Sequence, residues 1–280
     1  MHEHDVEKDR LSQLLGQEVL HLESLTGGLS NRCLLLTLAN GKAVWRPVSK
    51  ASSAFAVSRD NEQQVLQVLD TVQEKESRQF RAPKVLWQGK EGLLVEWLDG
   101  EVLDEQFSLH HLMALQAEIH TQPTPNHQLD VHLKAEQYWQ AIALQDKSPA
   151  LQAVFARFQR QPLPIHFPLA CCHLDLGTYN LIRQSDGCIG VLDWEYAAAA
   201  DPALDVAMTI HANGYDLQIA VEAYCDAKQA DTQLWLAAVK AWLPWCDYLA
   251  MLWYFAGASA WQDESYRQSG LALLSKLTAV

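Results

Sequence analysis

Hydrophobic positions in the first hundred residues follow the pattern of short strands joined by turns. Asn40-Gly41 stands between two apolar runs, which is a strong signal for a β-hairpin. Between Val57 and Leu69 the apolar residues recur instead at helical spacing. We therefore expect a small antiparallel sheet, with one helix at 54–72 inserted after the third strand. The predicted strands lie at 19–25, 33–38, 43–48, 84–88 and 92–97.

The pattern changes from Ser108 onward, where helical spacing dominates. Asp201-Pro202 is typical of a helix start. From there the chain is expected to be helical to its end, with Pro244 as a kink or a break. Earlier helices are predicted at 108–121, 133–145 and 149–160, and short strands at 168–172, 180–183 and 188–192.

The two patterns together predict an α+β protein. A length of 280 residues permits one large domain or two lobes that share a cleft. We expect an N-terminal lobe at 1–97, built on the sheet, and a mainly helical C-terminal lobe at 98–280. Residues 98–107 are the expected connection between the lobes.

The chain is acidic, with 21 Lys and Arg against 34 Asp and Glu and a formal net charge of −13. Because such a surface repels phosphate backbones, no nucleic acid partner is expected. A cationic small molecule would be tolerated or attracted.

The cysteines and the apolar stretches bear on the compartment. None of the six cysteines forms a CxxC pair, which indicates buried thiols in a reducing environment. The first ten residues lack the apolar region of a signal peptide, and His2 and His4 are expected in a disordered tail. The apolar stretch from Tyr248 to Trp261 is too short to span a bilayer. A cytoplasmic location without a membrane partner is expected, and the oligomeric state is left open.

Four polar residues near the middle of the chain have the order and spacing of a phosphoryl-transfer site. Asp175 would accept the proton of an attacking hydroxyl, and His173 would brace the loop through hydrogen bonds. Asn180 would bind Mg²⁺ through its side-chain oxygen, and Asp193 would bridge Mg²⁺ to the phosphates of ATP. The alternative is a loop whose Asp and Asn only cap turns.

Several other residues are candidates for binding the nucleotide. Adjacent glycines between two strands let backbone N–H groups approach phosphates. Arg46 has the register of the phosphate-binding lysine strand of protein kinases, with Glu62 on the next helix as its partner. Residues 93–97 would be a hinge strand whose backbone binds adenine. The expected nucleotide contacts are Gly27, Gly28, Ser30, Arg46, Glu62, Glu96 and Trp97.

Candidates for binding the acceptor come from two places. Glu195 is either a further metal or substrate ligand or a surface carboxylate. Aromatic residues crowd 242–261, and stacked rings can enclose a cation, although rings at helical spacing also build cores. The aromatic candidates are Trp245, Tyr248 and Trp253.

These motifs, in this order, resemble the aminoglycoside phosphotransferase and choline kinase superfamily. The matching pieces are GGLSN (27–31), AVWR (43–46), Glu62, LLVEW with DG (93–100), HLDLGTYN (173–180) and LDWEYA (192–197). The first and last of them look most like the branch of choline kinases and bacterial thiamine kinases. The Trp-rich segment 233–255 looks like that of the thiamine kinases. The resemblance implies a bilobal protein kinase-like fold, ATP and Mg²⁺, with Asp175 as base and Asn180 and Asp193 as metal ligands.

Two departures from related sequences stand out. Arg46 replaces the lysine usual in protein kinases, as it does in choline kinase-like enzymes. Many relatives read H-x-D-x-H-x-G-N in the catalytic loop, whereas Gly177, Thr178 and Tyr179 precede Asn180 here. The bulky Tyr179 therefore puts the path of the loop in question.

The leading hypothesis is an ATP-dependent phosphotransferase that acts on a small cationic alcohol, with thiamine first. Choline and aminoglycosides are alternative acceptors. A catalytically silent nucleotide-binding protein, motivated by Tyr179, is a second hypothesis. A metal-dependent hydrolase ranks below both, because HxH and HExxH spacings are missing.

Overall fold

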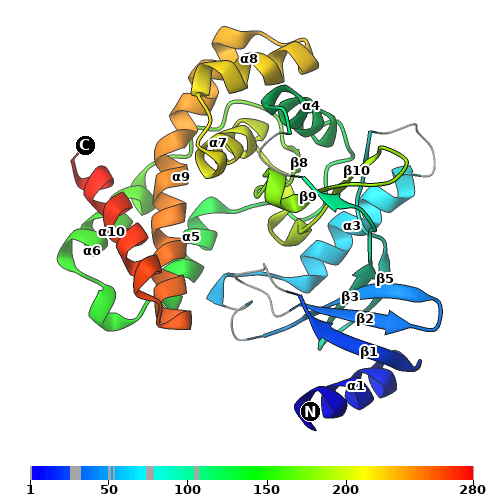
Figure 1. Ribbon diagram of the computed structural model, residues 1–280. Helices are drawn as coiled ribbons and strands as arrows, with labels where there is room; N and C mark the ends of the chain where they lie inside the picture. Colours follow the sequence, from blue (N-terminus) through cyan, green and yellow to red (C-terminus); the bar gives the residue numbers. More distant parts are fainter. Residues whose placement is uncertain are drawn as a thin grey trace.

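A computed structural model of the protein describes residues 2–25, 33–49, 52, 54–73, 79–103 and 107–279, without the side chains of 2–4 and 72–73. The N-terminal part of the chain contains a five-stranded antiparallel sheet in the order β1-β2-β3-β6-β5. In Figure 1 this sheet lies below the helical part, with α3 between the two. The elements are β1 (Val19–Ser24), β2 (Leu34–Leu38), β3 (Gly41–Pro47), α3 (Arg59–Gln73), β5 (Val85–Gly89) and β6 (Gly92–Glu96).

The predicted hairpin is confirmed. Strands β2 and β3 pair antiparallel, with Leu38 opposite Gly41, so Ala39 and Asn40 make the turn. Gly41 has φ of 133°, a backbone conformation that L side chains rarely adopt. The glycine therefore allows the chain to enter β3 directly from the turn.

A second, smaller sheet draws its strands from distant parts of the sequence. Its order is β4-β10-β9-β7, with β4 parallel to β10 and the other pairs antiparallel. The segment expected to be a connection, 98–107, contains β7, and the lobe boundary after residue 97 stays a prediction. The strands are β4 (Phe80–Arg81), β7 (Glu101–Val102), β9 (Leu181–Arg183) and β10 (Ile189–Val191), and a separate pair is β8 (Ala170–Cys172) with β11 (Ala198–Ala200).

The rest of the chain is helical, as expected. Asp201 accepts a hydrogen bond from Ala203 N and caps α7, which confirms the predicted helix start. Pro244 lies inside α9, which continues to Trp261. Of the two expected outcomes, a kink or a break, the break does not occur. The helices are α4 (Leu109–Ile119), α5 (Val131–Ala141), α6 (Pro149–Arg160), α7 (Pro202–Asn213), α8 (Leu217–Lys228), α9 (Thr232–Trp261) and α10 (Glu264–Thr278), with short 3₁₀ turns η1 (Leu144–Asp146), η2 (Thr178–Asn180) and η3 (Trp194–Tyr196).

Helix α9 is the centre of the helical part and contacts α5, α7, α8 and α10 (Figure 1). The segment before α3 also packs against it. Phe55 is fully buried, and its ring stacks on Trp261 at 4.7 Å and lies 5.3 Å from Trp253. A residue that precedes α3 in sequence is thereby part of the core of the helical part.

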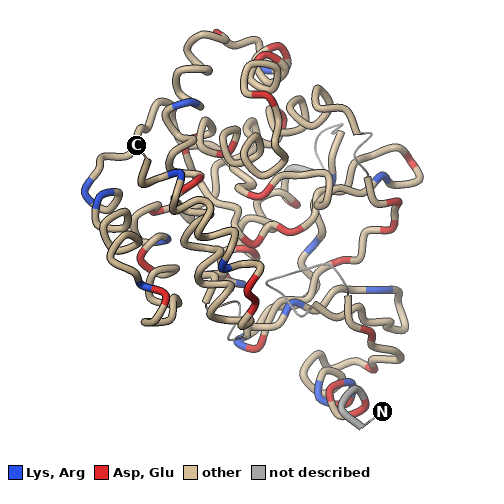
Figure 2. Tube along the Cα trace, turned by 60° about the vertical axis from the view of Figure 1, so that its left-hand side comes forward, with Lys and Arg blue, Asp and Glu red and all other residues tan. Residues whose placement is uncertain are grey.

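Residues of both charge signs occur in both parts of the molecule. Lys and Arg positions and Asp and Glu positions are both scattered along the described trace (Figure 2). Over the described ranges, no helix combines the length and the apolarity that crossing a bilayer requires. All six cysteines are free, and five of them are buried.

The N-terminal segment corrects one expectation. Residues His2–Leu15 form α1, not a disordered tail. Leu11 on this helix is fully buried and joins a core cluster with Val19, Leu36 and Trp45 of the sheet. The polar composition hid the few apolar residues that dock the helix on the sheet.

Leu11→Ala tests this docking. Truncating a fully buried leucine leaves a cavity, so the free energy of unfolding should fall by about 2–4 kcal/mol. Gln13→Ala, on the exposed side of the same helix, should change it by less than about 0.5 kcal/mol. Denaturant unfolding of both variants measures the difference, and equal small effects would show that α1 does not pack as described.

Candidate active site

The loop after β8 is held by a buried carboxylate. Asp205 on α7 accepts hydrogen bonds from the backbone N–H groups of His173, at 3.2 Å, and Leu174, at 2.7 Å. It is fully buried and also bonds His120 Nε2 at 2.8 Å. Leu174 has φ of 65°, a left-handed conformation that costs about 1 kcal/mol for a non-glycine residue. Asp205 therefore fixes the strained backbone from which Asp175 projects.

Asp175 is bonded on both carboxylate oxygens. Tyr179 donates its hydroxyl hydrogen to Oδ1 at 2.9 Å, and Asn180 Nδ2 lies 3.3 Å from Oδ2. Burial, followed by the negative charge of Asp193, raises the pKa of Asp175 from 3.8 to about 7, against the opposing bond from Tyr179. A carboxylate with a pKa near neutrality is suited to accept a proton from a substrate hydroxyl.

Asn180 and Asp193 are brought to the same cavity by backbone pairing. Asn180 Nδ2 donates to the carbonyl of Asp175 at 2.9 Å, and its own carbonyl accepts from Leu192 N at 2.8 Å. Leu192 directly precedes Asp193, and both Asn180 and Asp193 line the cavity. A carboxylate and an amide oxygen are hard donors of the kind that Mg²⁺ binds. The donor set therefore fits the predicted metal.

His173 forms a hydrogen bond to the segment that follows β10. Its side chain is fully buried, and Nε2 lies 2.9 Å from the carbonyl oxygen of Leu192. Burial lowers the pKa of His173, so the ring is neutral and Nε2 carries the hydrogen that Leu192 accepts. The bond braces the two loops against each other, in the manner expected of His173.

Arg46 is the centre of a buried ion-pair network. Its Nε lies 2.7 Å from Glu62 Oε1, its Nη2 lies 3.1 Å from Glu195 Oε2, and it also pairs with Asp193. Arg59 Nη1 contacts the same two glutamates, at 2.6 Å to Glu62 and 3.3 Å to Glu195. The expected pair of Arg46 and Glu62 is therefore present, and two further carboxylates share the arginine.

The pKa values of Asp193 and Glu195 are shifted in opposite directions within this network. Burial works to raise the pKa of Asp193, but Arg46 and Arg59 outweigh it and hold that pKa below its usual value. Burial and the neighbouring Asp193 instead raise the pKa of Glu195. Glu195 is buried and borders the cavity, which excludes its interpretation as a surface carboxylate.

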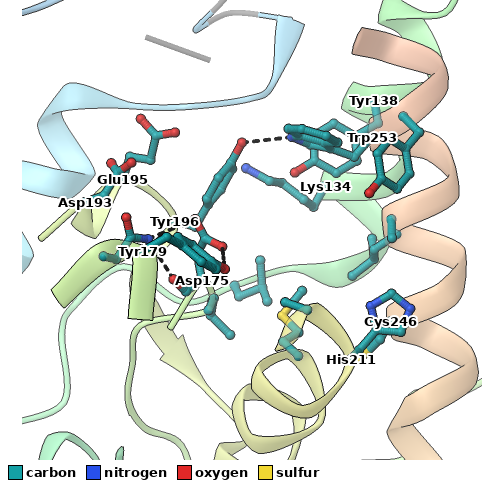
Figure 3. Close-up of a pocket in the computed structure, with 18 residues that line it drawn as sticks. Lys134, Tyr138, Asp175, Tyr179, Asp193, Glu195, Tyr196, His211, Cys246 and Trp253 are labelled. Atoms are coloured by element: carbon teal, nitrogen blue, oxygen red, sulfur yellow. Dashed lines mark hydrogen bonds between the residues drawn. The ribbon is translucent and has the colours of Figure 1, made fainter. Parts of the chain in front are cut away.

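A cavity of about 450 Å³ opens above these residues. Asp175, Asn180, Asp193 and Glu195 line one end of it. In Figure 3, Lys134, Tyr138 and Trp253 lie together on the side away from Asp193 and Glu195, and the side chain of Tyr196 extends toward them from beside Asp175. Trp253 Nε1 donates to the Tyr196 hydroxyl at 3.2 Å, so the rings hold each other in place. The cavity thus joins an acidic end to an aromatic one.

The remaining predicted residues do not share one location. Trp245 and Tyr248 are buried in the core, where both pack against the ring of Phe158, so the expectation that they contact an acceptor is not met. Trp253, predicted with them, does line the cavity. Glu96 ends β6, and Trp97 bonds Asp99 through Nε1 at 2.6 Å. The phosphate-loop candidates Gly27, Gly28 and Ser30 lie outside the described residues.

Lys134, Tyr138 and Tyr196 are cavity residues that sequence reasoning missed. Lys134 and Tyr138 are four residues apart on α5, a spacing that places them on one face of a helix. That signal indicates a shared face but not what the face meets. Tyr196 directly follows the recognised Asp193-Trp194-Glu195 motif, and its position could have been noticed there.

Comparisons with known proteins agree with this geometry. The sequence profile of the phosphotransferase enzyme family matches residues 21–242. The chain is 28% identical to the thiamine kinase of Escherichia coli O157:H7 over 190 residues, which are 68% of this chain and 66% of that protein. The match therefore spans slightly under two thirds of that relative's length.

Solved structures show the fold. The choline kinase LicA from Streptococcus pneumoniae is similar with a TM-score of 0.73 at 19% identity, covering 99% of this chain and 100% of that chain. The Plasmodium vivax ethanolamine kinase is similar with a TM-score of 0.68 at 13% identity, covering 92% and 81%. The architecture is the α+β, protein kinase-like fold of small-molecule kinases. The chain belongs to the phosphotransferase enzyme family.

Asp175→Asn tests the electrostatics of the site independently of turnover. Because the folded-state pKa is raised from 3.8 to about 7, ionised Asp175 destabilises the fold at pH 8, and this penalty shrinks as pH falls toward 3.8. In buffer with EDTA, the variant should melt about 2–4 °C higher than wild type at pH 8. Its advantage should be smaller at pH 5. An unchanged or lower melting temperature at pH 8 would contradict the account of Asp175.

Proposed function

We propose that the protein transfers the γ-phosphoryl group of ATP to the hydroxyl of a small alcohol. The observation that carries this proposal is the convergence of Asp175, Asn180 and Asp193 at one end of a cavity large enough for a small molecule. Turn caps with no further role would not require two carboxylates and an amide to meet in this way. A reducing compartment, and hence a cytoplasmic location, is supported by the six free cysteines.

Each residue has a stated task in the proposed reaction. Asp175 accepts the proton of the acceptor hydroxyl and orients the oxygen toward the phosphorus. Asn180 and Asp193 hold Mg²⁺, which neutralises charge on the phosphate oxygens when it is bound. Arg46, held by Glu62, places a fixed positive charge beside Asp193. Tyr179 must give up its bond to Asp175 Oδ1, or share that oxygen, when the acceptor binds.

ATP is the proposed phosphoryl donor. LicA has been solved in complex with AMP, and aminoglycoside 2'-phosphotransferase-IIIa in complex with GDP, which supports a nucleotide site in this fold. On this chain the backbone of Glu96 and Trp97, together with Gly27, Gly28 and Ser30, is the proposed nucleotide contact. Glu96 N already donates to Lys84 O at 2.8 Å, so Trp97 is the stronger candidate of the hinge pair.

Thiamine is the proposed acceptor. Its support is the likeness to E. coli thiamine kinase and the shape of the cavity, where an acidic end meets aromatic rings. The cationic ring that carries the hydroxyethyl group suits the acidic residues Asp175, Asp193 and Glu195. Choline, ethanolamine and aminoglycosides are the alternatives suggested by relatives of similar fold.

A catalytically silent nucleotide-binding protein is the second candidate. The bond from Tyr179 to Asp175 favours it, because the tyrosine hydroxyl competes for the oxygen that an acceptor hydroxyl would use. The exposure of Tyr179 is an argument against this candidate. The residue is half exposed, so its side chain has room to move away from Asp175.

A radiolabelled-ATP transfer assay decides between these candidates. Wild-type protein with Mg²⁺ is offered thiamine, choline, ethanolamine and an aminoglycoside, and phosphorylated thiamine is the expected main product. Asp175→Asn should lower kcat by at least about 10²-fold, because general-base catalysis contributes this much, while ATP binding persists. Transfer to another alcohol in place of thiamine would refute the acceptor, and ATP binding without any transfer would favour the silent protein.

A further inference from the structure

Lys134 extends from α5 into the aromatic end of the cavity. Figure 3 shows its side chain reaching toward the ring of Tyr196. Nζ lies 4.7 Å from the centre of the Tyr196 ring and 5.4 Å from that of Tyr138. These are distances at which an ammonium is attracted to the face of an aromatic ring. The chain therefore places a cation of its own on the rings that would otherwise receive a cationic ligand.

The ammonium is also fixed by the backbone. Nζ donates hydrogen bonds to the carbonyl of Ala56 at 2.8 Å and to that of Phe55 at 3.2 Å. Phe55 is itself buried against Trp253 and Trp261. This packing fixes the backbone segment that carries the two carbonyls. An ammonium has three N–H groups, which leaves one donor for a ligand in the cavity.

We infer that Lys134 selects the acceptor by charge, so that the part of the acceptor lying on Tyr138 and Tyr196 is an uncharged group able to accept a hydrogen bond. This inference rests on the proposed function of the cavity as the acceptor site. A second cation on the same rings would face Lys134 in a poorly solvated space, where like charges repel strongly. Burial lowers the pKa of Lys134 to about 7, against the opposing charge of Glu195. The ammonium therefore carries its full charge, and repels a second cation most strongly, below that pH.

The inference narrows the acceptor class. Thiamine satisfies it with its uncharged aminopyrimidine toward Lys134 and its cationic ring toward Asp175 and Glu195. Choline has a quaternary ammonium and no uncharged group that could take the place of the pyrimidine. The cavity is thus selective for a molecule that has a cationic group near its hydroxyl and an uncharged group at its other end.

A pair of alcohols of the same shape tests the selection. Choline and 3,3-dimethylbutan-1-ol differ only in a charged nitrogen or a neutral carbon at the branch point. Dissociation constants for both are measured at pH 6, below the lowered pKa of Lys134, by ligand-observed NMR titration of the full-length protein without nucleotide. The quantity compared is the ratio of the choline constant to that of the neutral alcohol.

Removing the charge of Lys134 should change this ratio. In Lys134→Gln, which keeps an N–H donor for the two carbonyls, the ratio should fall at least 10-fold from its wild-type value. Lys134→Met is the second neutral variant and should show the same fall. Lys134→Arg keeps the charge and should stay within twofold of wild type. Because a ratio is measured within each variant, a general loss of affinity cancels.

Lys147 provides a matched control. Its Nζ also lies 4.7 Å from the centre of an aromatic ring, that of Trp139, but the residue does not line the cavity. Lys147→Met should leave the ratio within twofold of wild type. A ratio that is unchanged in both neutral variants of Lys134, or failure of both alcohols to bind any variant, would overturn the inference. The result does not depend on turnover, so an absence of phosphoryl transfer would refute the proposed function separately.

Discussion

The guanidinium of Arg46 is the constraint on which the rest of the site depends. It lies on a strand of the N-terminal sheet, yet two of its three carboxylate partners, Asp193 and Glu195, come from the motif that follows β10. Burying these carboxylates would be costly without a buried positive charge, because breaking a buried pair destabilises a protein by about 3–5 kcal/mol. The same arginine keeps Asp193 ionised, as metal binding requires. One side chain thus joins the sheet to the helical part and prepares the proposed magnesium ligand.

The second constraint is backbone strain held by buried hydrogen bonds. Leu174 and Asp193 both have left-handed backbone conformations, with φ of 65° and 60°. Each stands at a point where the chain turns sharply to present a carboxylate, and such strain persists only where surrounding contacts determine it. Asp205 supplies these contacts for Leu174, and the bond from His173 to Leu192 supplies one beside Asp193. The backbone of the site is therefore held by residues that do not line the cavity.

Local patterns predicted much of this molecule, and packing decided what they missed. The Asn40-Gly41 hairpin and the Asp201 cap follow from neighbouring residues, so they were predictable. The strands β4, β7 and β11 were missed, because two or three residues leave no periodic signal. The strands β8, β9 and β10 are equally short, but they lie in apolar runs beside the recognised motif and were predicted. Trp245 and Trp253 illustrate the limit for the site: eight residues apart, they are rotated by about 80° on a helix of 3.6 residues per turn, and one enters the core while the other meets the cavity. The placement of Lys134 depends on how α5 docks, which no local pattern contains.

A double-mutant cycle at Arg46 and Glu195 tests the central claim, that a buried ion pair couples the sheet to the Asp193-Trp194-Glu195 motif. The free energy of unfolding is measured for wild type, Arg46→Met, Glu195→Gln and the double variant in metal-free buffer. Because the two residues are direct partners in a buried network, the effects of the two single substitutions on the free energy of unfolding should differ from additivity by more than about 1 kcal/mol. The exposed pair of Arg10 and Glu7, treated in the same way, should couple by less than about 0.5 kcal/mol. Additivity within about 0.5 kcal/mol at Arg46 and Glu195 would contradict the account.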